Sequence, residues 1–184
     1  MRALQVLARE HAAIERCRTH FARETATIAG RGEADAEAVD RLISFFEVQV
    51  DGHHQEKEER VLMPRLLARA RGEDVLTLET LADEHGQQRR LLAQMRNQLE
   101  GAAYGEPNSL AVLVRCTWNY LRAQREHSEW EGRTLFPLAA RILDARDDRA
   151  LVRGFRSVDE LFGTSVLDSE RALAAWLAER HATV

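Results

Sequence analysis

The feature that most constrains the fold is an internal repeat of a polar sequence. Residues 54–64 read HQEKEERVLMP and residues 127–137 read HSEWEGRTLFP, so both segments place His, Glu, Leu and Pro at the same offsets. A second repeat matches LAREH at residues 7–11 with LADEH at residues 81–85. In each half, a single histidine is followed 43 or 42 residues later by an HxxxE segment. The order of these elements indicates a duplicated pair of structural units.

The composition and the chain breaks predict helices for these units. Ala, Leu, Glu and Arg dominate, β-branched residues are sparse, and there are only three prolines and ten glycines, which is typical of helical proteins. Turn-forming residues divide the chain into five helical segments. Ser109 is the expected N-cap of the fourth segment. The breaks are GRGE at 30–33, RGED at 71–74, GAAYGEPN at 101–108 and DARDD at 144–148.

Four of these segments are expected to pack side by side. The first and third carry apolar residues at steps of three and four, and each stripe is interrupted by a histidine at the same place, His11 or His85. Long helices with short connections favour an all-α, up-down-up-down four-helix bundle over residues 1–143. Residues 144–184 form an additional C-terminal helix, whose apolar face packs on the bundle or binds a partner.

The charges narrow the range of partners. The net charge is -4, 30% of residues are charged, and the arginines are scattered among acids, so we expect no nucleic-acid partner. Arg9 and Glu10 interrupt the N-terminal apolar residues, which predicts neither a signal peptide nor a membrane span and favours a cytoplasmic location. Cys17 and Cys116 lack CxxC spacing, so we expect buried thiols without a disulfide.

The repeated polar residues are predicted to meet inside the bundle. His11 and His54 both lie ~27–29 Å along their helices from the shared turn, at 1.5 Å per residue. His85 and His127 agree in height to within ~3 Å by the same reckoning. In each HxxxE segment the His and Glu lie four apart on one helix face, and the second segment shares its face with apolar residues.

Six buried polar groups require compensation, because each one left unpaired costs a few kcal/mol. Taken singly, a histidine in a seam is an ordinary core residue and an HxxxE is an ordinary exposed pair. Their repeated order at matching heights favours two metal ions, each with two imidazoles and a share of two bridging carboxylates. Such a set leaves room for a bridging oxide or hydroxide and an exchangeable position. The predicted ligands are His11, His54, Glu58, His85, His127 and Glu131.

At these residues the chain resembles the hemerythrin-like family, the HHE cation-binding domains. The resemblance covers residues 1 to about 143, and its marks are the EH of LAREH and LADEH and the two HxxxE segments, each followed by L-[MF]-P. It implies a left-handed four-helix bundle that holds two non-haem iron ions, Fe2+ or Fe3+, bridged by Glu58 and Glu131. The identity of the metal rests on this resemblance, because the same donors also bind zinc.

One departure from the family pattern affects the expected function. The oxygen carriers of the family place a second histidine one turn after the first on the third helix, whereas Arg89 follows His85 here. We therefore expect peroxide, nitric oxide or oxygen chemistry in place of reversible oxygen carriage. Tyr120 is a core residue or an added donor, and Glu15 is a surface or neighbouring residue. Glu56, Glu59 and Glu129 are expected to be solvated charges.

Three functions remain open at this point. The first is a di-iron protein that binds oxygen, nitric oxide or iron, and the second is an enzyme of the same fold that consumes peroxide or nitric oxide. In both, the partner is a small diatomic or peroxide ligand. The third is a metal-free or zinc-bound helical interaction module that uses the C-terminal segment.

Overall fold

The computed structural model describes residues 1–182, except for the side chains at positions 76, 77, 79, 80, 82, 181 and 182. Helices make up the described part, which contains no strand, as the composition predicts. In chain order the elements are α1 (Arg2–Arg31), α2 (Ala36–Phe45), the π-helical η1 (Phe46–His54) and η2 (Lys57–Leu62), α3 (Met63–Arg69), α4 (Glu73–Ala103), α5 (Pro107–Trp130), the π-helical η3 (Glu131–Leu135), α6 (Phe136–Ile142), α7 (Ala145–Phe162) and α8 (Val166–Ala182).

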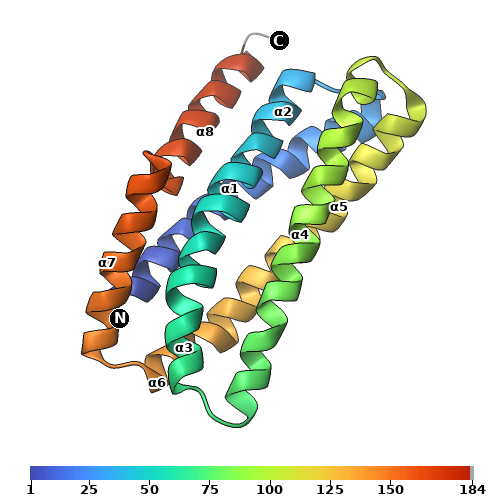
Figure 1. Ribbon diagram of the computed structural model, residues 1–184. Helices are drawn as coiled ribbons and strands as arrows, with labels where there is room; N and C mark the ends of the chain where they lie inside the picture. The colour runs from blue at the N-terminus through green and yellow to red at the C-terminus, as the bar shows by residue number, and fades with distance from the viewer. Residues whose placement is uncertain (183–184) are drawn as a thin grey trace.

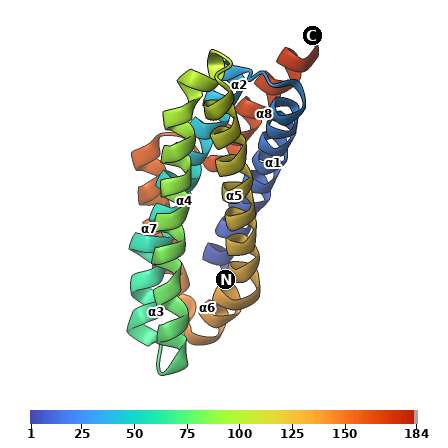
Figure 2. The ribbon, with the colours of Figure 1, turned by 90° about the vertical axis from the view of Figure 1, so that its right-hand side faces the viewer.

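Four long helical rods form the predicted up-down-up-down bundle (Figures 1 and 2). The rods are α1, the run from α2 to α3, α4, and the run from α5 to α6. α1 contacts α2 and α5, and α4 contacts α2 and α5, so the four rods close a ring. The four rods therefore enclose a common interior.

The helix ends follow local chemistry, with one difference from the prediction. α1 ends at Gly32, whose positive φ of 70° suits a residue without a Cβ. Asp35 caps α2 by accepting from the Ala38 amide at 3.1 Å. The fourth rod begins at Pro107 with Glu106 as its N-cap, so the prediction of Ser109 is wrong. A proline with its fixed φ favours the first helical position, and this moves the start ahead of the serine.

The core consists of two apolar clusters with a polar layer between them. One cluster surrounds Phe21, Phe46 and Tyr120, and the other surrounds Leu7 and Leu62. Their separation along the bundle places the His and Glu residues of the repeat between two water-excluding layers. Cys17 and Cys116 are buried free thiols, as predicted.

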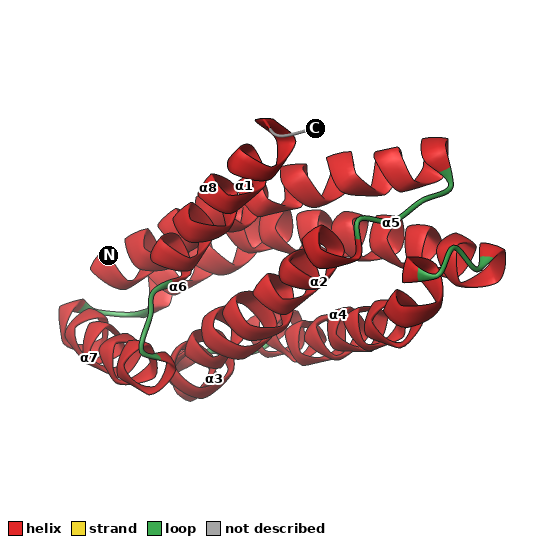
Figure 3. Ribbon diagram, turned by 90° about the horizontal axis from the view of Figure 1, so that it is seen from above, coloured by secondary structure: helices red, strands yellow, loops and turns green. Residues whose placement is uncertain are grey.

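The C-terminal segment forms two helices where the sequence predicts one. α7 begins with a capping box between Asp144 and Asp147 and ends at Gly163, whose φ is 69°. α7 packs against α1, η1 and η2, and α8 packs against α1, α2 and η1, which covers one face of the bundle (Figures 1 and 3). An ion pair of 2.8 Å between Arg16 and Glu170 joins α1 to α8. None of the described helices is long and apolar enough to cross a membrane.

Candidate metal centre

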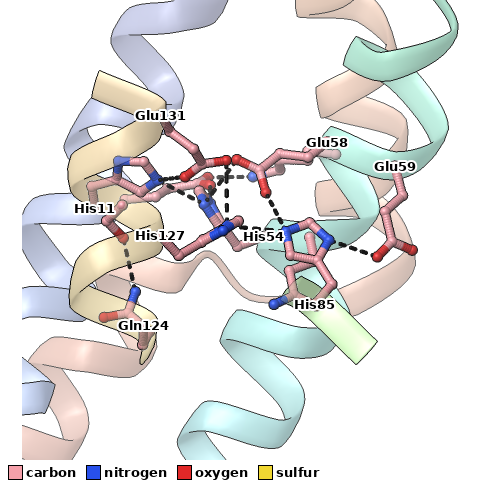
Figure 4. A network of polar contacts seen from close by, with 12 residues as sticks. His11, His54, Glu58, Glu59, His85, Gln124, His127 and Glu131 are labelled. Atoms are coloured by element: carbon pink, nitrogen blue, oxygen red, sulfur yellow. Dashed lines mark hydrogen bonds and ion pairs between the residues drawn. The ribbon is translucent and has the colours of Figure 1, made fainter. Parts of the chain in front are cut away.

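Six polar side chains from all four rods converge in the middle of the bundle (Figure 4). Each comes from a different turn of the chain, and they meet because the repeat sets them at one height. They are the six residues that the sequence predicts: His11 on α1, His54 at the end of η1, Glu58 on η2, His85 on α4, His127 on α5 and Glu131 at the start of η3.

The six residues form two overlapping groups that share their carboxylates. One group holds His11 and His54 and the other holds His85 and His127, and both contain Glu58 and Glu131. Within each group the candidate ligand atoms lie within 4.8 Å of one another. The Nε2 atoms face each other in pairs, 3.0 Å apart for His11 and His54 and 3.1 Å apart for His85 and His127. This arrangement can hold two cations side by side.

Both HxxxE segments lie on locally widened helix. Glu58 lies in η2 and Glu131 opens η3, whereas the sequence spacing predicts a regular α-helix at both places. The paired atoms still meet, with Nε2 of His54 3.3 Å from Glu58 and Nε2 of His127 3.5 Å from Glu131. π-Helical turns are rare and occur frequently at functional sites. Their presence at both copies is a feature that the residue pattern does not encode.

The two shared carboxylates face imidazole nitrogens but make no hydrogen bond of the kind that buried oxygens normally have. Glu58 and Glu131 are fully buried, and none of their four oxygens makes a hydrogen bond within the described part of the chain. Each such group costs ~1–3 kcal/mol. Donors bound to one ion at ~2.0–2.1 Å and at right angles are ~3 Å apart, which matches the observed pairings of 3.0 to 3.5 Å. The donor set therefore fits cations.

The pKa values of the buried residues show which of them favour a proton. Burial lowers the pKa of His11 to about 3, and the charge of His54 adds to this effect. Burial opposes protonation of His54 too, but Glu58 and Glu10 outweigh it and raise its pKa well above the usual value. Burial raises the pKa of Glu131 well above its usual value and the charge of Glu58 raises it further, while His54 overcomes burial and lowers the pKa of Glu58. Protonation is therefore favoured at His54 and Glu131 and disfavoured at His11 and Glu58.

The glutamates that precede the repeated histidines, Glu10 before His11 and Glu84 before His85, have a role that the sequence does not reveal. Nδ1 of His54 donates to Glu10 at 2.8 Å, and Nδ1 of His127 donates to Glu84 at 2.7 Å. In each half, this glutamate therefore fixes the orientation of the histidine ring on the next rod. Carboxylates at this position orient metal-binding imidazoles and increase their basicity.

The ring of His85 is held by Glu59, a residue that the sequence predicts to be a solvated charge. Glu59 accepts from Nδ1 of His85 at 2.7 Å and from Arg89 at 2.5 Å, so that expectation is wrong for Glu59. Arg89 also donates to Gln55 at 2.8 Å. The arginine that replaces the family's second histidine therefore supports the carboxylate behind His85, and supplies no donor to the centre.

Two further candidates lie outside the centre. Tyr120 is fully buried, and its ring contacts Phe46 with centroids 5.2 Å apart. Burial raises its pKa well above the usual value, which fits the predicted core residue. Glu15 is more than half exposed and pairs with Arg18, as expected for a surface residue.

The centre is most accessible beside His11. The side chain of His11 is 14% exposed, against 0–5% for the other five residues. A surface hollow of about 500 Å³ between α1 and α5 reaches His11 and is also lined by Arg18 and Arg125. This face is therefore the open side of an otherwise enclosed site.

Comparison with known proteins places most of this centre in a described domain. The family model described as "Hemerythrin HHE cation binding domain" matches residues 2–115. The matched segment contains His11, His54, Glu58 and His85 and ends before the second HxxxE. No curated protein and no solved structure matches the chain. His127 and Glu131 join the site on the evidence of geometry.

Proposed function

The chain belongs to the hemerythrin HHE cation-binding family, and we propose that it holds two iron ions at which it binds or reacts with oxygen, peroxide or nitric oxide. The observation that carries the proposal is the set of four buried carboxylate oxygens of Glu58 and Glu131, which make no hydrogen bond and each lie 3.0 to 3.5 Å from a histidine Nε2. Burying such carboxylates is costly unless they are paired or bind a metal ion.

The six residues have distinct roles in this proposal. Each ion would be held by two imidazole nitrogens from one of the two groups, and both ions would share Glu58 and Glu131, which belong to both groups. Four protein donors per ion leave positions open for a small ligand. Glu10, Glu59 and Glu84 keep the rings of three histidines in the orientation that binding needs.

Iron supplies a two-electron couple between two Fe2+ and two Fe3+ together with open coordination positions. Neutral imidazoles outnumber carboxylates in the donor set, and imidazoles stabilise high-valent iron less than carboxylates do. The donor set therefore favours binding or two-electron chemistry over the oxidation of hydrocarbons. The charge that remains on the centre is also a reason for the buried Glu10 beside His54.

The surroundings favour a small ligand. The two apolar clusters close the site along the bundle axis, and the hollow beside His11 is the accessible approach. Its charged lining is balanced, since Arg18 pairs with Glu15 and Arg125 pairs with Glu129. Size therefore selects the ligand more than charge does, and oxygen, nitric oxide and peroxide all meet this requirement.

The test is the metal content and visible spectrum of protein purified in air. We expect two irons per chain and a charge-transfer absorption band that changes when azide, peroxide or nitric oxide is added. A turnover assay for peroxide and nitric oxide then distinguishes a binding protein from an enzyme. A colourless protein that contains zinc or no metal would contradict the proposal and support the metal-free or zinc-bound interaction module.

A further inference from the structure

A buried lysine lies behind one of the histidines of the centre. Lys57 has a side chain that is only 1% exposed, and its ammonium contacts the carboxylates of Glu10 and Asp159. The distance from its Nζ to Asp159 is 2.6 Å. Glu10 is the residue that accepts from Nδ1 of His54. An unbroken series of charged contacts therefore runs from Asp159 through Lys57 and Glu10 to His54.

This series begins on a helix outside the four-helix bundle. Asp159 lies on α7, beyond the segment that matches the family model. It also accepts from Nε2 of the buried His53 at 2.7 Å. Two residues of the second rod that flank the HxxxE ligands are thus held by one carboxylate of α7.

α7 is seated closely enough to hold this contact. The ring of Phe162 stacks on His53 with centroids 4.6 Å apart and an interplanar angle of 2°. A Cβ at Gly52 would come within 3.1 Å of Phe162, and a Cβ at Gly154 would overlap Val61. Glycine at these two positions allows α7 to approach η1 and η2 at short distance.

We propose that Lys57 and Asp159 are positioning residues for His54, so that α7 is part of the metal centre; this inference rests on the proposed function. Glu10 strengthens the donor character of the His54 ring through Nδ1. Lys57 fixes the position of Glu10 and offsets its negative charge, and Asp159 does the same for Lys57. A buried carboxylate without a counter-charge is strongly destabilised, so loss of Lys57 or Asp159 changes the position or protonation of Glu10.

Among the side chains that the structure describes, the second half of the repeat has no such series. The residue aligned with Lys57 is Trp130, and the side chain of Glu84, which holds His127, is 41% exposed. The proposed effect is therefore confined to the ion held by His11 and His54.

The variants Lys57→Met and Asp159→Asn remove the charges with little change in volume. We expect each to weaken the binding of one of the two ions by roughly tenfold or more, the range seen when the residue behind a metal-bound histidine is lost. The reduction potential of the centre shifts in the same two variants, and Asp159→Glu restores the wild-type value. Glu170→Gln is the matched control, because it breaks a contact between α8 and α1 without touching the series.

A second measurement does not depend on bound metal. In the metal-free protein, 15N NMR of the histidine rings, assigned with His54→Gln, should show His54 protonated at Nδ1 in the wild type. In Lys57→Met and Asp159→Asn we expect a shifted or averaged signal. Unchanged ring signals and unchanged affinity in both variants would overturn the inference. A wild-type protein that binds no metal would overturn the proposed function, and the NMR result would still decide the positioning role.

Discussion

The two HxxxE segments share the spacing and the geometry of their His and Glu residues but differ in the residues that surround them. His54 and Glu58 approach to 3.3 Å, and His127 and Glu131 to 3.5 Å. Glu59 of the first segment holds the ring of His85. The aligned residue of the second is Gly132, which has no side chain to hold His11, and the ring of His11 stacks on Phe136.

The repeat therefore accounts for the donors of both halves, while the residues around them differ and control access. His85 is fully buried behind a carboxylate, while its counterpart His11 is partly exposed and has no carboxylate on Nδ1 among the described residues. A repeat that was still symmetrical would give two equivalent ions. In the proposed centre, a ligand from the surface would first reach an ion between His11 and His54, because His11 is the most exposed of the six residues.

The largest effect is expected where the two halves act alike. Glu58→Ala and Glu131→Ala each remove a carboxylate shared by both ions, so both variants should lose metal, measured by metal analysis after loading. Glu15→Ala is the control, because Glu15 also lies four residues after a histidine but pairs with Arg18 at the surface. Retention of both irons by either of the first two variants would contradict the bridging roles.

A smaller effect should distinguish Glu10 from Glu84, the glutamates that precede His11 and His85. Glu10 is buried and joined to Lys57, whereas the side chain of Glu84 is 41% exposed. We expect Glu10→Gln to weaken binding of one ion by roughly 10–100-fold, and Glu84→Gln to do so by less, because water replaces an exposed partner more easily. The measurement is a competition titration with a chelator of known affinity. Equal losses would show that burial of the outer carboxylate does not matter.

Much of this site follows from sequence, for a definite physical reason. The heights of His11 and His85 on their helices depend on spacing within one rod, and the repeat supplies the spacing of the second half. The roles of Lys57 and Asp159 depend on where α7 docks, a long-range contact that periodicity does not encode. The widened helix at Glu58 likewise depends on packing. The overall bundle was therefore predictable, while the groups that adjust the centre were not.

A fall in pH should weaken the binding of cations in both halves of the repeat. The pKa of His54 and that of Glu131 are raised well above their usual values in the cation-free site, by neighbouring carboxylates and by burial respectively. A cation must displace these protons, so affinity should rise as pH increases through the raised pKa values and fall on acidification. The change is up to about tenfold per pH unit for each proton released. Calorimetry in buffers of different ionisation enthalpy measures the number of protons, and a value of zero would contradict this account.

The smallest effect tests the open side directly. Gly132→Glu places a carboxylate at the position that the repeat aligns with Glu59, which accepts from His85, and a Cβ there meets nothing within 4 Å. By this alignment we expect the new side chain beside His11, so the variant should keep both ions and bind azide several-fold more slowly in stopped-flow mixing. Gly132→Ala separates the two contributions, since it adds a Cβ without a carboxylate. If azide enters both variants at the wild-type rate, the approach does not run past Gly132, and the asymmetry of the halves must control ligand entry from another face.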